Sequence, residues 1–313
     1  MGLYPKQVRE YLAGKIPFGP LSQIYLFDPV NGVAGQNGLS WEKPLKTLTA
    51  AAALLTTDQH DTAVFLAGDT ADEPAALINW NKDYTHLIGL SANVPGMGQR
   101  CRIVGTAALD LARLVTFAGA GCIVENIKFS NEGDAAGALG AVLVSGERNY
   151  FKNCMFAGMV HATPAAEALG YSLTVSGDEN YFEDCVIGLD TIVRGAANAE
   201  LILSGKRNHF RRCIFQSNSV TAAKVLVRVD NSGGDLRYNI FEDCLFWNYT
   251  ENWATGIDNV FDMPASGATH TIIMWGKNEF HGQISGWADT LTHIKGGAPA
   301  TGAGFGVAVS PTG

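Results

Sequence analysis

The apolar positions of this chain fall in short runs of Val, Ile, Leu, Phe and Thr that are punctuated by Gly and Asn. One phrase recurs among these runs, Asn-x-Phe-x-x-Cys-x-Phe, with successive copies 31, 28 and 31 residues apart. It reads NYFKNCMF from Asn149, NYFEDCVI from Asn180, NHFRRCIF from Asn208 and NIFEDCLF from Asn239. No helical periodicity lies between the copies. A repeat of this length is typical of a solenoid, in which one unit cannot bury its apolar face alone.

A β-rich run precedes each copy, and three of these runs end in Ser-Gly: VLVSG (142–146), LTVSG (173–177) and LILSG (201–205). A chain that coils once per repeat stacks each strand on its counterpart in the next coil, about 4.8 Å away. The pattern therefore predicts an all-β fold, a single-stranded parallel β-helix with about 30 residues per coil. A weaker copy, CIVENIKF, begins at Cys122, and NEFHGQ from Asn278 is interpreted as a degraded copy that keeps Asn and Phe280.

Equivalent positions of successive coils should stack into columns. The alternation of side chains predicts two inward-facing columns, Phe151/Phe182/Phe210/Phe241 and Cys154/Cys185/Cys213/Cys244. It also predicts a ladder at a turn, in which side-chain amides bond from coil to coil, formed by Asn149, Asn180, Asn208 and Asn239. The glycines of the Ser-Gly pairs, Gly146, Gly177 and Gly205, are expected to supply the positive φ angle that tight corners need.

The variable positions of the phrase carry alternating charges. One position runs Lys152, Glu183, Arg211, Glu242, and its neighbour runs Asn153, Asp184, Arg212, Asp243. Opposite charges across paired strands are favourable and like charges are not, so this alternation favours direct stacking of the copies. Exposed pairs contribute only about 0.2–1 kcal/mol each. Their expected role is to fix the register of the coils.

Composition limits the classes of function. The chain has 313 residues, 47% of them hydrophobic and 17% charged, which is enough to bury a sizeable core. Its net charge of −8 argues against nucleic-acid and anionic-membrane binding, which need basic patches. No apolar run is long enough to span a bilayer. The start, MGLYPKQVREYL, lacks the apolar core of a secretory signal, and we expect the protein to assemble in a cytoplasm.

The six cysteines indicate structure and not metal or redox chemistry. They contain no CxxC pair, and four of them occupy one column of the repeat, where Cys acts as a small buried apolar residue. We expect all six to be reduced, because stacked side chains rarely have the torsion that a disulfide needs. No metal ligand set and no cofactor fingerprint is present, so the sequence predicts no cofactor.

The segment DPVNG…NGLSWEKPLKTLTAAAALL, followed by TAVFLAGD, resembles the opening of pectin-lyase-like right-handed parallel β-helix proteins. The resemblance implies a right-handed coil over residues 28–295 with a capping helix near 44–56, an N-terminal arm at 1–27 and a Gly/Ala-rich C-terminal tail at 296–313. HLIGLSANVPGMGQRCRIVG, together with CIVENIKF and the later copies, resembles a branch found among tailed-phage virion proteins. That branch implies a homotrimer.

A search for catalytic residues favours no enzyme. A glycosidase needs two carboxylates at a defined separation. The obvious pairs, Glu183/Asp184 and Glu242/Asp243, belong to the alternating columns, with Arg211 and Arg212 as their expected neighbours. Asp178/Glu179 should likewise face Lys206/Arg207 of the next coil. A dyad of Asp230 with Asp258 or Asp262 stays open, because stacked loops converge in space. The seven histidines are dispersed, without HxH or HExxH.

Aromatic residues crowd the C-terminal third of the chain, Trp275 among them. They are candidates for closing the coil and contacting a subunit, or for stacking on a glycan: Trp247, Tyr249, Trp253 and Trp287.

The sequence thus favours a non-enzymatic virion structural protein, a capsid decoration or cement protein that binds the shell through its termini. The expected partners are the major capsid protein or another virion protein and further copies of this chain, with a host glycan as a further candidate and no nucleic acid or membrane. The alternative is a tailspike-like receptor-binding protein or polysaccharide depolymerase. A bacterial surface adhesin is disfavoured by the missing export signal.

Overall fold

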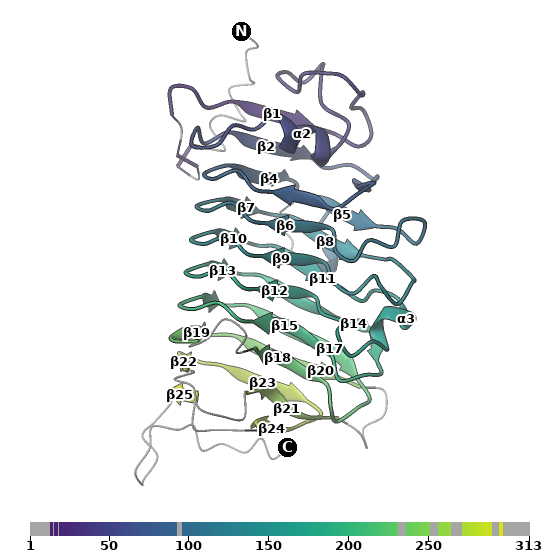
Figure 1. The fold of residues 1–313 in the computed structure, drawn as a ribbon, viewed down its shortest axis with the longest axis vertical. Coiled ribbons are helices and arrows are strands. Elements are labelled where there is room, and N and C mark those ends of the chain that lie inside the picture. The colour runs from purple at the N-terminus through teal and green to yellow at the C-terminus, as the bar shows by residue number, and fades with distance from the viewer. Residues whose placement is uncertain are drawn as a thin grey trace.

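The computed structural model describes residues 13–14, 16–17, 19–92, 96–230, 236–250, 256–263, 271–289 and 294–296. Within these residues the strands form three parallel sheets of ten, seven and eight strands. The chain visits the ten-stranded, the seven-stranded and then the eight-stranded sheet once per coil, and the coils stack from the N-terminal to the C-terminal end (Figure 1). The fold is a single-stranded right-handed parallel β-helix, as the repeat and its resemblance predict.

The bounds of the strands are as follows. The ten-stranded sheet contains β1 (Ile24–Phe27), β2 (Thr62–Leu66), β4 (His86–Leu90), β7 (Ile123–Glu125), β10 (Tyr150–Lys152), β13 (Tyr181–Glu183), β16 (His209–Arg211), β19 (Asn239–Glu242), β22 (Ile272–Trp275) and β25 (Ile294–Gly296). The seven-stranded sheet contains β5 (Arg102–Gly105), β8 (Lys128–Asn131), β11 (Met155–Ala157), β14 (Val186–Arg194), β17 (Ile214–Ser219), β20 (Leu245–Tyr249) and β23 (Glu279–Gly282). The eight-stranded sheet contains β3 (Ile78–Trp80), β6 (Val115–Phe117), β9 (Val142–Val144), β12 (Leu173–Val175), β15 (Ala199–Leu203), β18 (Val225–Val229), β21 (Ile257–Asp262) and β24 (Ile284–Ala288).

The phenylalanine column lies in the core in direct coil-to-coil register. Phe151, Phe182, Phe210 and Phe241 are all fully buried and directly paired across β10, β13, β16 and β19. Their rings stack with centroids 4.8, 4.8 and 5.0 Å apart and interplanar angles of 6°, 9° and 12°. Stacked pairs contribute about 0.5–1.5 kcal/mol each beyond burial, so the column stabilises each coil through its neighbours.

The cysteine column follows at the corner between the ten- and seven-stranded sheets. Each thiol donates to a backbone carbonyl of the preceding coil, as Cys185 does to Phe151 and Cys213 to Phe182, at 3.5 and 3.4 Å. All six cysteines are free and buried. Burial raises the pKa of Cys154, Cys185 and Cys213 well above the ordinary value, so the reactive thiolate is disfavoured.

Cys244 is the last cysteine of this column, and the residue stacked on it in the next coil is an asparagine. Its side chain is buried as predicted, and its thiol donates to the carbonyl of Phe210 at 3.3 Å, as the earlier cysteines do one coil before. The next coil, however, places Asn278 at the same corner, because Glu279 pairs with Leu245. Asn278 Oδ1 accepts the N–H of Cys244 at 2.9 Å. At this step an amide therefore replaces the thiol as the coil-to-coil partner.

Native protein should leave its thiols unmodified by a disulfide reagent at pH 8, because the column buries them, and all six should react after denaturation. Spectrophotometric thiol titration with and without guanidinium measures both values. Rapid labelling of the native protein would contradict the buried column.

Most hydrogen bonds of the asparagine ladder join a side chain to the backbone, and few join two side-chain amides. The Oδ1 atoms of Asn149, Asn180, Asn208 and Asn239 accept the backbone N–H of the equivalent residue one coil earlier, at 2.8–3.0 Å. Among the side chains of this ladder only one amide–amide bond accompanies these, from Asn180 to Asn208 at 3.2 Å. The backbone donor is preferred because a tight turn leaves its N–H without a strand partner.

The role expected for the Ser-Gly glycines is corrected by the structure. Gly146, Gly177 and Gly205 do not have a positive φ angle. A Cβ atom on Gly177 would instead lie inside contact distance of the backbone carbonyl of Gly146, and a Cβ on Gly205 would meet Gly177 in the same way. The positive φ angles of the corners belong to other residues: Arg148, Asn153, Glu179, Asp184, Arg207, Arg212, Tyr238 and Asp243. Glycine is thus required by the close approach of successive coils.

The weak copy CIVENIKF stacks on the next coil as expected. Val124 pairs with Phe151 in the ten-stranded sheet, and Phe129 pairs with Phe156 in the seven-stranded sheet. The column of apolar side chains therefore continues through a coil that lacks the full phrase.

The interpretation of NEFHGQ as a degraded copy in the same register was wrong. Asn278 occupies the corner of the cysteine column and not that of the asparagine ladder. Phe280 pairs with Phe246 in the seven-stranded sheet, and the strand that stacks on Phe241 is β22, through Met274. A shared Asn and Phe are too few letters to fix which corner of the coil they occupy.

The N-terminal end of the coil is closed by α2 (Leu48–Leu54), whose Leu48 and Ala51 are fully buried in the main core (Figure 1). The helix is shorter than the expected 44–56 because Thr47 is its N-cap and accepts from Ala50 N at 3.2 Å. Lys82 Nζ donates to carbonyls at its C-terminus, including that of Ala53 at 3.0 Å.

The β-helix also begins earlier in the sequence than residue 28, where it was expected to start. Strand β1 starts at Ile24, inside the arm placed at 1–27, and Ile16 packs with Ile24 and Val64 on the outer face of the ten-stranded sheet. Residues 1–12 of the arm and 297–313 of the tail lie outside the described residues.

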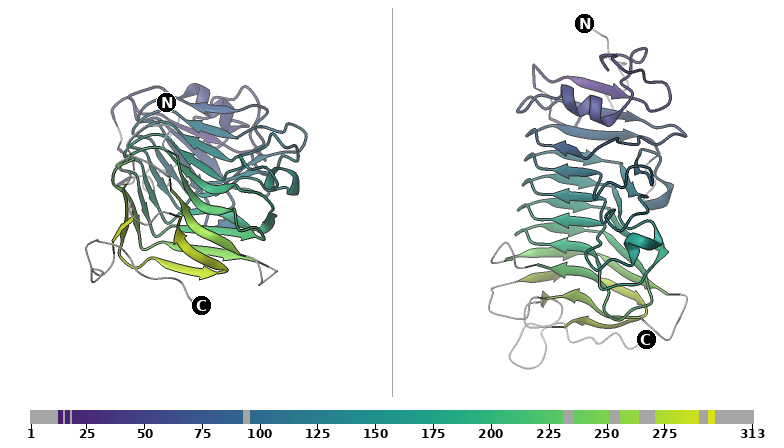
Figure 2. Two further views of the ribbon diagram at one scale, coloured as in Figure 1. Left: turned by 60° about the horizontal axis from the view of Figure 1, so that its bottom comes forward. Right: turned by 45° about the vertical axis from the view of Figure 1, so that its right-hand side comes forward.

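The described loops between the seven- and eight-stranded sheets project from one side of the coil. The largest projection carries α3 (Ala162–Ala165), which stands out from that side in Figure 1 and in the right-hand view of Figure 2. Its C-terminal carbonyls are tied to the next coil, because Gly195 N and Asn198 Nδ2 both donate to Ala165 O. These loops are where the otherwise uniform solenoid carries individual features.

Candidate functional site

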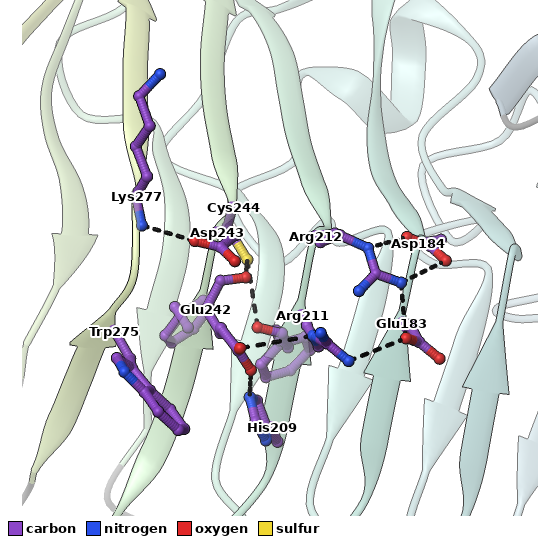
Figure 3. Close-up of polar contacts among 12 residues, drawn as sticks. Glu183, Asp184, His209, Arg211, Arg212, Glu242, Asp243, Cys244, Trp275 and Lys277 are labelled. Carbon is purple, nitrogen blue, oxygen red and sulfur yellow. Dashed lines mark hydrogen bonds and ion pairs between the residues drawn. The ribbon is translucent and has the colours of Figure 1, made fainter.

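The outer face of the ten-stranded sheet gathers the charged positions of the repeat. We call the six side chains Lys152, Glu183, Asp184, Arg211, Arg212 and Glu242 the charged ladder. Strand pairing places Lys152, Glu183, Arg211 and Glu242 opposite one another, and Trp275 continues the same column. Figure 3 shows most of these side chains side by side on adjacent strands.

Most of the ion pairs expected from the alternating charges are present, but among the described residues Asp243 forms none with Arg212 and instead accepts the backbone N–H of Lys277 at 2.7 Å. Arg212 contacts Asp184 and Glu183, both at 2.7 Å, and Arg211 lies 3.4 Å from Glu183 and 3.5 Å from Glu242. Bonds from Tyr150 and Arg212 outweigh burial, which acts in the opposite direction, and lower the pKa of Glu183. The ladder is thus a fixed array of charged groups and not a set of free side chains.

A second outer column, Tyr150, Tyr181 and His209, lies beside the ladder, and each ring reaches the charged residue one coil further on. Tyr150 donates to Glu183, Tyr181 contacts Arg211, and His209 Nε2 lies 2.8 Å from Glu242 Oε2, off the direction of a hydrogen bond. Burial lowers the pKa of His209 in spite of this carboxylate. The imidazole is therefore neutral at pH 7, and its contact with Glu242 is not an ion pair.

This arrangement does not form a carboxylate dyad for glycan cleavage. Glu183 and Glu242 are two strands apart, about 10 Å along the stack, with Arg211 between them. A general acid needs a raised pKa and a base needs a free carboxylate, whereas the pKa of Glu183 is lowered. Glu179 is held between Arg148 and Arg207 at 2.7 and 2.6 Å.

One of the acids left open as a loop dyad is paired with an arginine in the same way. Asp262, one candidate for a loop dyad, pairs with Arg228 at 3.0 Å.

The four aromatic residues singled out in the sequence have different environments. Trp287 is partly buried and packs against Phe280, with ring centroids 3.5 Å apart, so it closes the C-terminal end of the core. Trp247 is partly exposed on β20, Tyr249 is exposed, and Trp253 lies outside the described residues. The most exposed tryptophan that the structure describes is Trp275, at 59%. Its exposure could not be read from the sequence, because a tryptophan after an apolar run fits the core equally well.

A buried ionic cluster under α3 was also missed by sequence reasoning. The side chains of Arg194, Glu200 and Lys224 are fully buried, and both cations lie 3.0 Å from the same oxygen, Glu200 Oε1. Ser172 donates to the other carboxylate oxygen, and Arg194 also donates to the carbonyls of residues 158 and 159. The cluster therefore ties together loops of three successive coils.

The pKa values of Glu200 and Lys224 are both lowered, but for different reasons. Burial alone would raise the pKa of Glu200, but Arg194 and Lys224 outweigh it and lower that pKa. Burial lowers the pKa of Lys224 below its ordinary 10.5, and Lys224 Nζ has no hydrogen bond to a described residue. The signal that could have revealed the cluster is an Arg, a Glu and a Lys in loops of otherwise low charge.

A pair of histidines covers the ten-stranded sheet near its N-terminal end. His86 is fully buried, and its Nδ1 accepts the N–H of Ile123 at 3.1 Å, so its Nε2 carries the proton and faces His60 Nδ1 at 3.1 Å. Burial, with a smaller effect of His60, lowers the pKa of His86 from 6.5 to about 3. The ring is therefore kept neutral by the fold.

Acid should destabilise the protein through His86. Above pH 6.5 the His86 ring is neutral in both the folded and the unfolded chain. As the pH falls below 6.5, the ring binds a proton in the unfolded chain but stays neutral in the folded chain. The loss between pH 7 and pH 5 should be about 2 kcal/mol. Urea unfolding of wild type and His86→Asn, which keeps an acceptor for Ile123, measures it. An unchanged pH slope in the variant would contradict this account.

Neither a metal centre nor a membrane helix emerges from the structure. In the described part of the chain no three His, Cys, Asp or Glu side chains gather as metal ligands. No helix within the same residues has the length and apolar character to cross a bilayer.

Comparison with known proteins identifies the fold but gives no activity or partner. No family model and no curated protein matches the sequence. Among solved structures, the pectin methylesterase of Erwinia chrysanthemi is similar over 92% of this chain and 91% of its own, with a TM-score of 0.57 and 14% identity. A pectin methylesterase in complex with a hexasaccharide (78% and 77%, TM-score 0.52, 16% identity) and a pectate lyase (90% and 80%, TM-score 0.51, 14% identity) are also similar. The chain thus has the pectin-lyase-like right-handed β-helix fold, and identities this low carry no activity with them.

Proposed function

We propose that this chain is a non-enzymatic structural protein of a tailed-phage virion, a capsid decoration or cement protein. The observation that supports it most is the pairing of the acids. The carboxylates that the coil brings together, Glu179, Glu183 and Asp184, are each held by an arginine. A rigid stack of such coils is suited to a scaffold. In the proposal, the chain binds the major capsid protein or another virion protein through its termini and forms a homotrimer.

Negative-stain imaging of virions labelled with an antibody to this chain tests the location. Label over the shell supports the proposal, and label at the tail tip or no label contradicts it. Purified protein should also sediment with expanded capsids and should be oligomeric by light scattering. A monomer that fails to bind capsids would rule out the proposed role.

The second candidate function is a receptor-binding protein or polysaccharide depolymerase. It is favoured by the fold that the chain shares with pectin methylesterases. Release of reducing sugar from a host capsular polysaccharide, lost in Asp258→Asn or Asp262→Asn, would establish it in place of the first.

A further inference from the structure

Trp275 stands where the charged ladder ends, on the outer face of the ten-stranded sheet. It is paired directly with Glu242 across β19 and β22, and 59% of it is exposed. In Figure 3 its ring lies alongside Glu242, and His209 lies on the other side of Glu242, two strands from Trp275. We call Trp275, Glu242, Arg211 and His209 the Trp275 platform. It combines one flat aromatic surface with fixed hydrogen-bonding groups.

The platform retains unused bonding capacity. The guanidinium of Arg211 has five N–H donors, and its side chain is 39% exposed in spite of its contacts with Glu183 and Glu242. Each carboxylate oxygen of Glu242 accepts more than one bond. Because ion pairs already hold both side chains, a ligand would lose little affinity to ordering them.

The charge balance selects among ligands. With Asp243 beside Glu242, the charged positions of the repeat hold three cations and four anions, so they offer no net attraction to a polyanion. Beside Trp275 the outer column continues with Ile240 and Ile273, both only partly exposed. That is less apolar surface than the packed centre of a protein–protein hot spot needs.

We propose that the Trp275 platform binds a neutral oligosaccharide. The C–H face of a pyranose ring would stack on Trp275, and its hydroxyl groups, which both donate and accept, would bond to Glu242 and Arg211 together. The ladder from Trp275 to Lys152 spans four strand spacings, about 19 Å, so it accommodates an extended chain of sugars. The inference is independent of the location proposed above.

Saturation-transfer NMR of the full chain with cellohexaose, maltohexaose and laminarihexaose at millimolar concentration tests the proposal. We expect binding of at least one of them, weakened about tenfold or more in Trp275→Ala. Glu242→Gln should weaken it about three- to tenfold. Trp41→Ala, which removes another exposed tryptophan far along the coil, is the matched control and should bind as wild type does. Thermal unfolding establishes that the variants are folded.

Three results would overturn the proposal. These are no binding of any of the three hexasaccharides by the wild type, equal binding by wild type and Trp275→Ala, or an equal loss in Trp41→Ala. An acidic probe, hexagalacturonate, separates neutral from charged ligands. Tighter binding of this probe than of every neutral one would contradict the inferred ligand class.

Discussion

Replacement of Glu200 by glutamine is expected to lower the free energy of unfolding by about 3–5 kcal/mol. The carboxylate is the one anion paired with Arg194 and Lys224 in the described structure, and all three side chains are fully buried. Without it the guanidinium of Arg194 stays charged and loses its counterion, since arginine is not deprotonated in proteins. Urea unfolding followed by circular dichroism at pH 7 measures the loss.

Lys224→Met is the matched control within the same cluster, and it should be neutral or stabilising at pH 7. Its ammonium has no hydrogen bond to a described residue, and Arg194 still pairs with Glu200 after the change. The lowered pKa of Lys224 means that the unfolded chain binds this proton more readily. Wild type should therefore lose stability as the pH falls from 10.5, and the variant should lack that part of the slope. Equal losses in Glu200→Gln and Lys224→Met would refute this view of the cluster.

Gly177→Ala is expected to destabilise the protein by about 3 kcal/mol or more, at the upper end of the cost of overpacking. The added Cβ would meet the backbone carbonyl of Gly146, which cannot swing aside as a side chain can. The two coils would have to separate locally, and their ladder of backbone bonds would be strained along with them.

Gly137→Ala provides the control for this prediction. Gly137 lies in an exposed turn, has no positive φ angle, and has no atom within 4 Å of an added Cβ. Its replacement should leave stability within about 0.5 kcal/mol of wild type or raise it slightly. A similar small effect at Gly177 would show that successive coils can yield at the Ser-Gly corners.

The stacking of the coils could be predicted because the same sequence phrase occurs in several successive coils. Phe182 lies on Phe151 for the same reason that Glu183 lies beside Arg211: equal positions in equal units must align when strands pair in register. The outline of the charged ladder followed from the same alternation. The reason for glycine at position 177 did not follow, because a corner and a close approach both call for glycine.

The prediction of the coil register was weakest where the repeated phrase is no longer complete in the sequence. Cys244 is buried in its column as expected, but the residue that follows it in the next coil is Asn278, which was interpreted from the sequence as the first residue of a degraded copy. The backbone register of β20 and β23 decides this placement, and two shared letters do not.

Two features had no repeated pattern behind them. Arg194, Glu200 and Lys224 are ordinary charged residues by sequence, and they meet only because the end of β14 and the start of β15 pack against the loop before β18 in the next coil. Trp275 and Trp287 are alike in sequence context, yet one is exposed and the other covers Phe280. Burial depends on what the rest of the chain covers, and that information is not local.

The sequence by itself determined the parallel β-helix, the order of its coils and the inward columns, because identical units impose identical neighbours. The tertiary structure alone decided the rest: the backbone partner of the asparagine ladder, the buried charges beneath α3 and the exposed tryptophan beside Glu242. The first depends on backbone geometry at a corner, and the other two depend on which segments the rest of the chain covers. Repetition specifies a scaffold, and the features that set one coil apart from the next are not encoded in it.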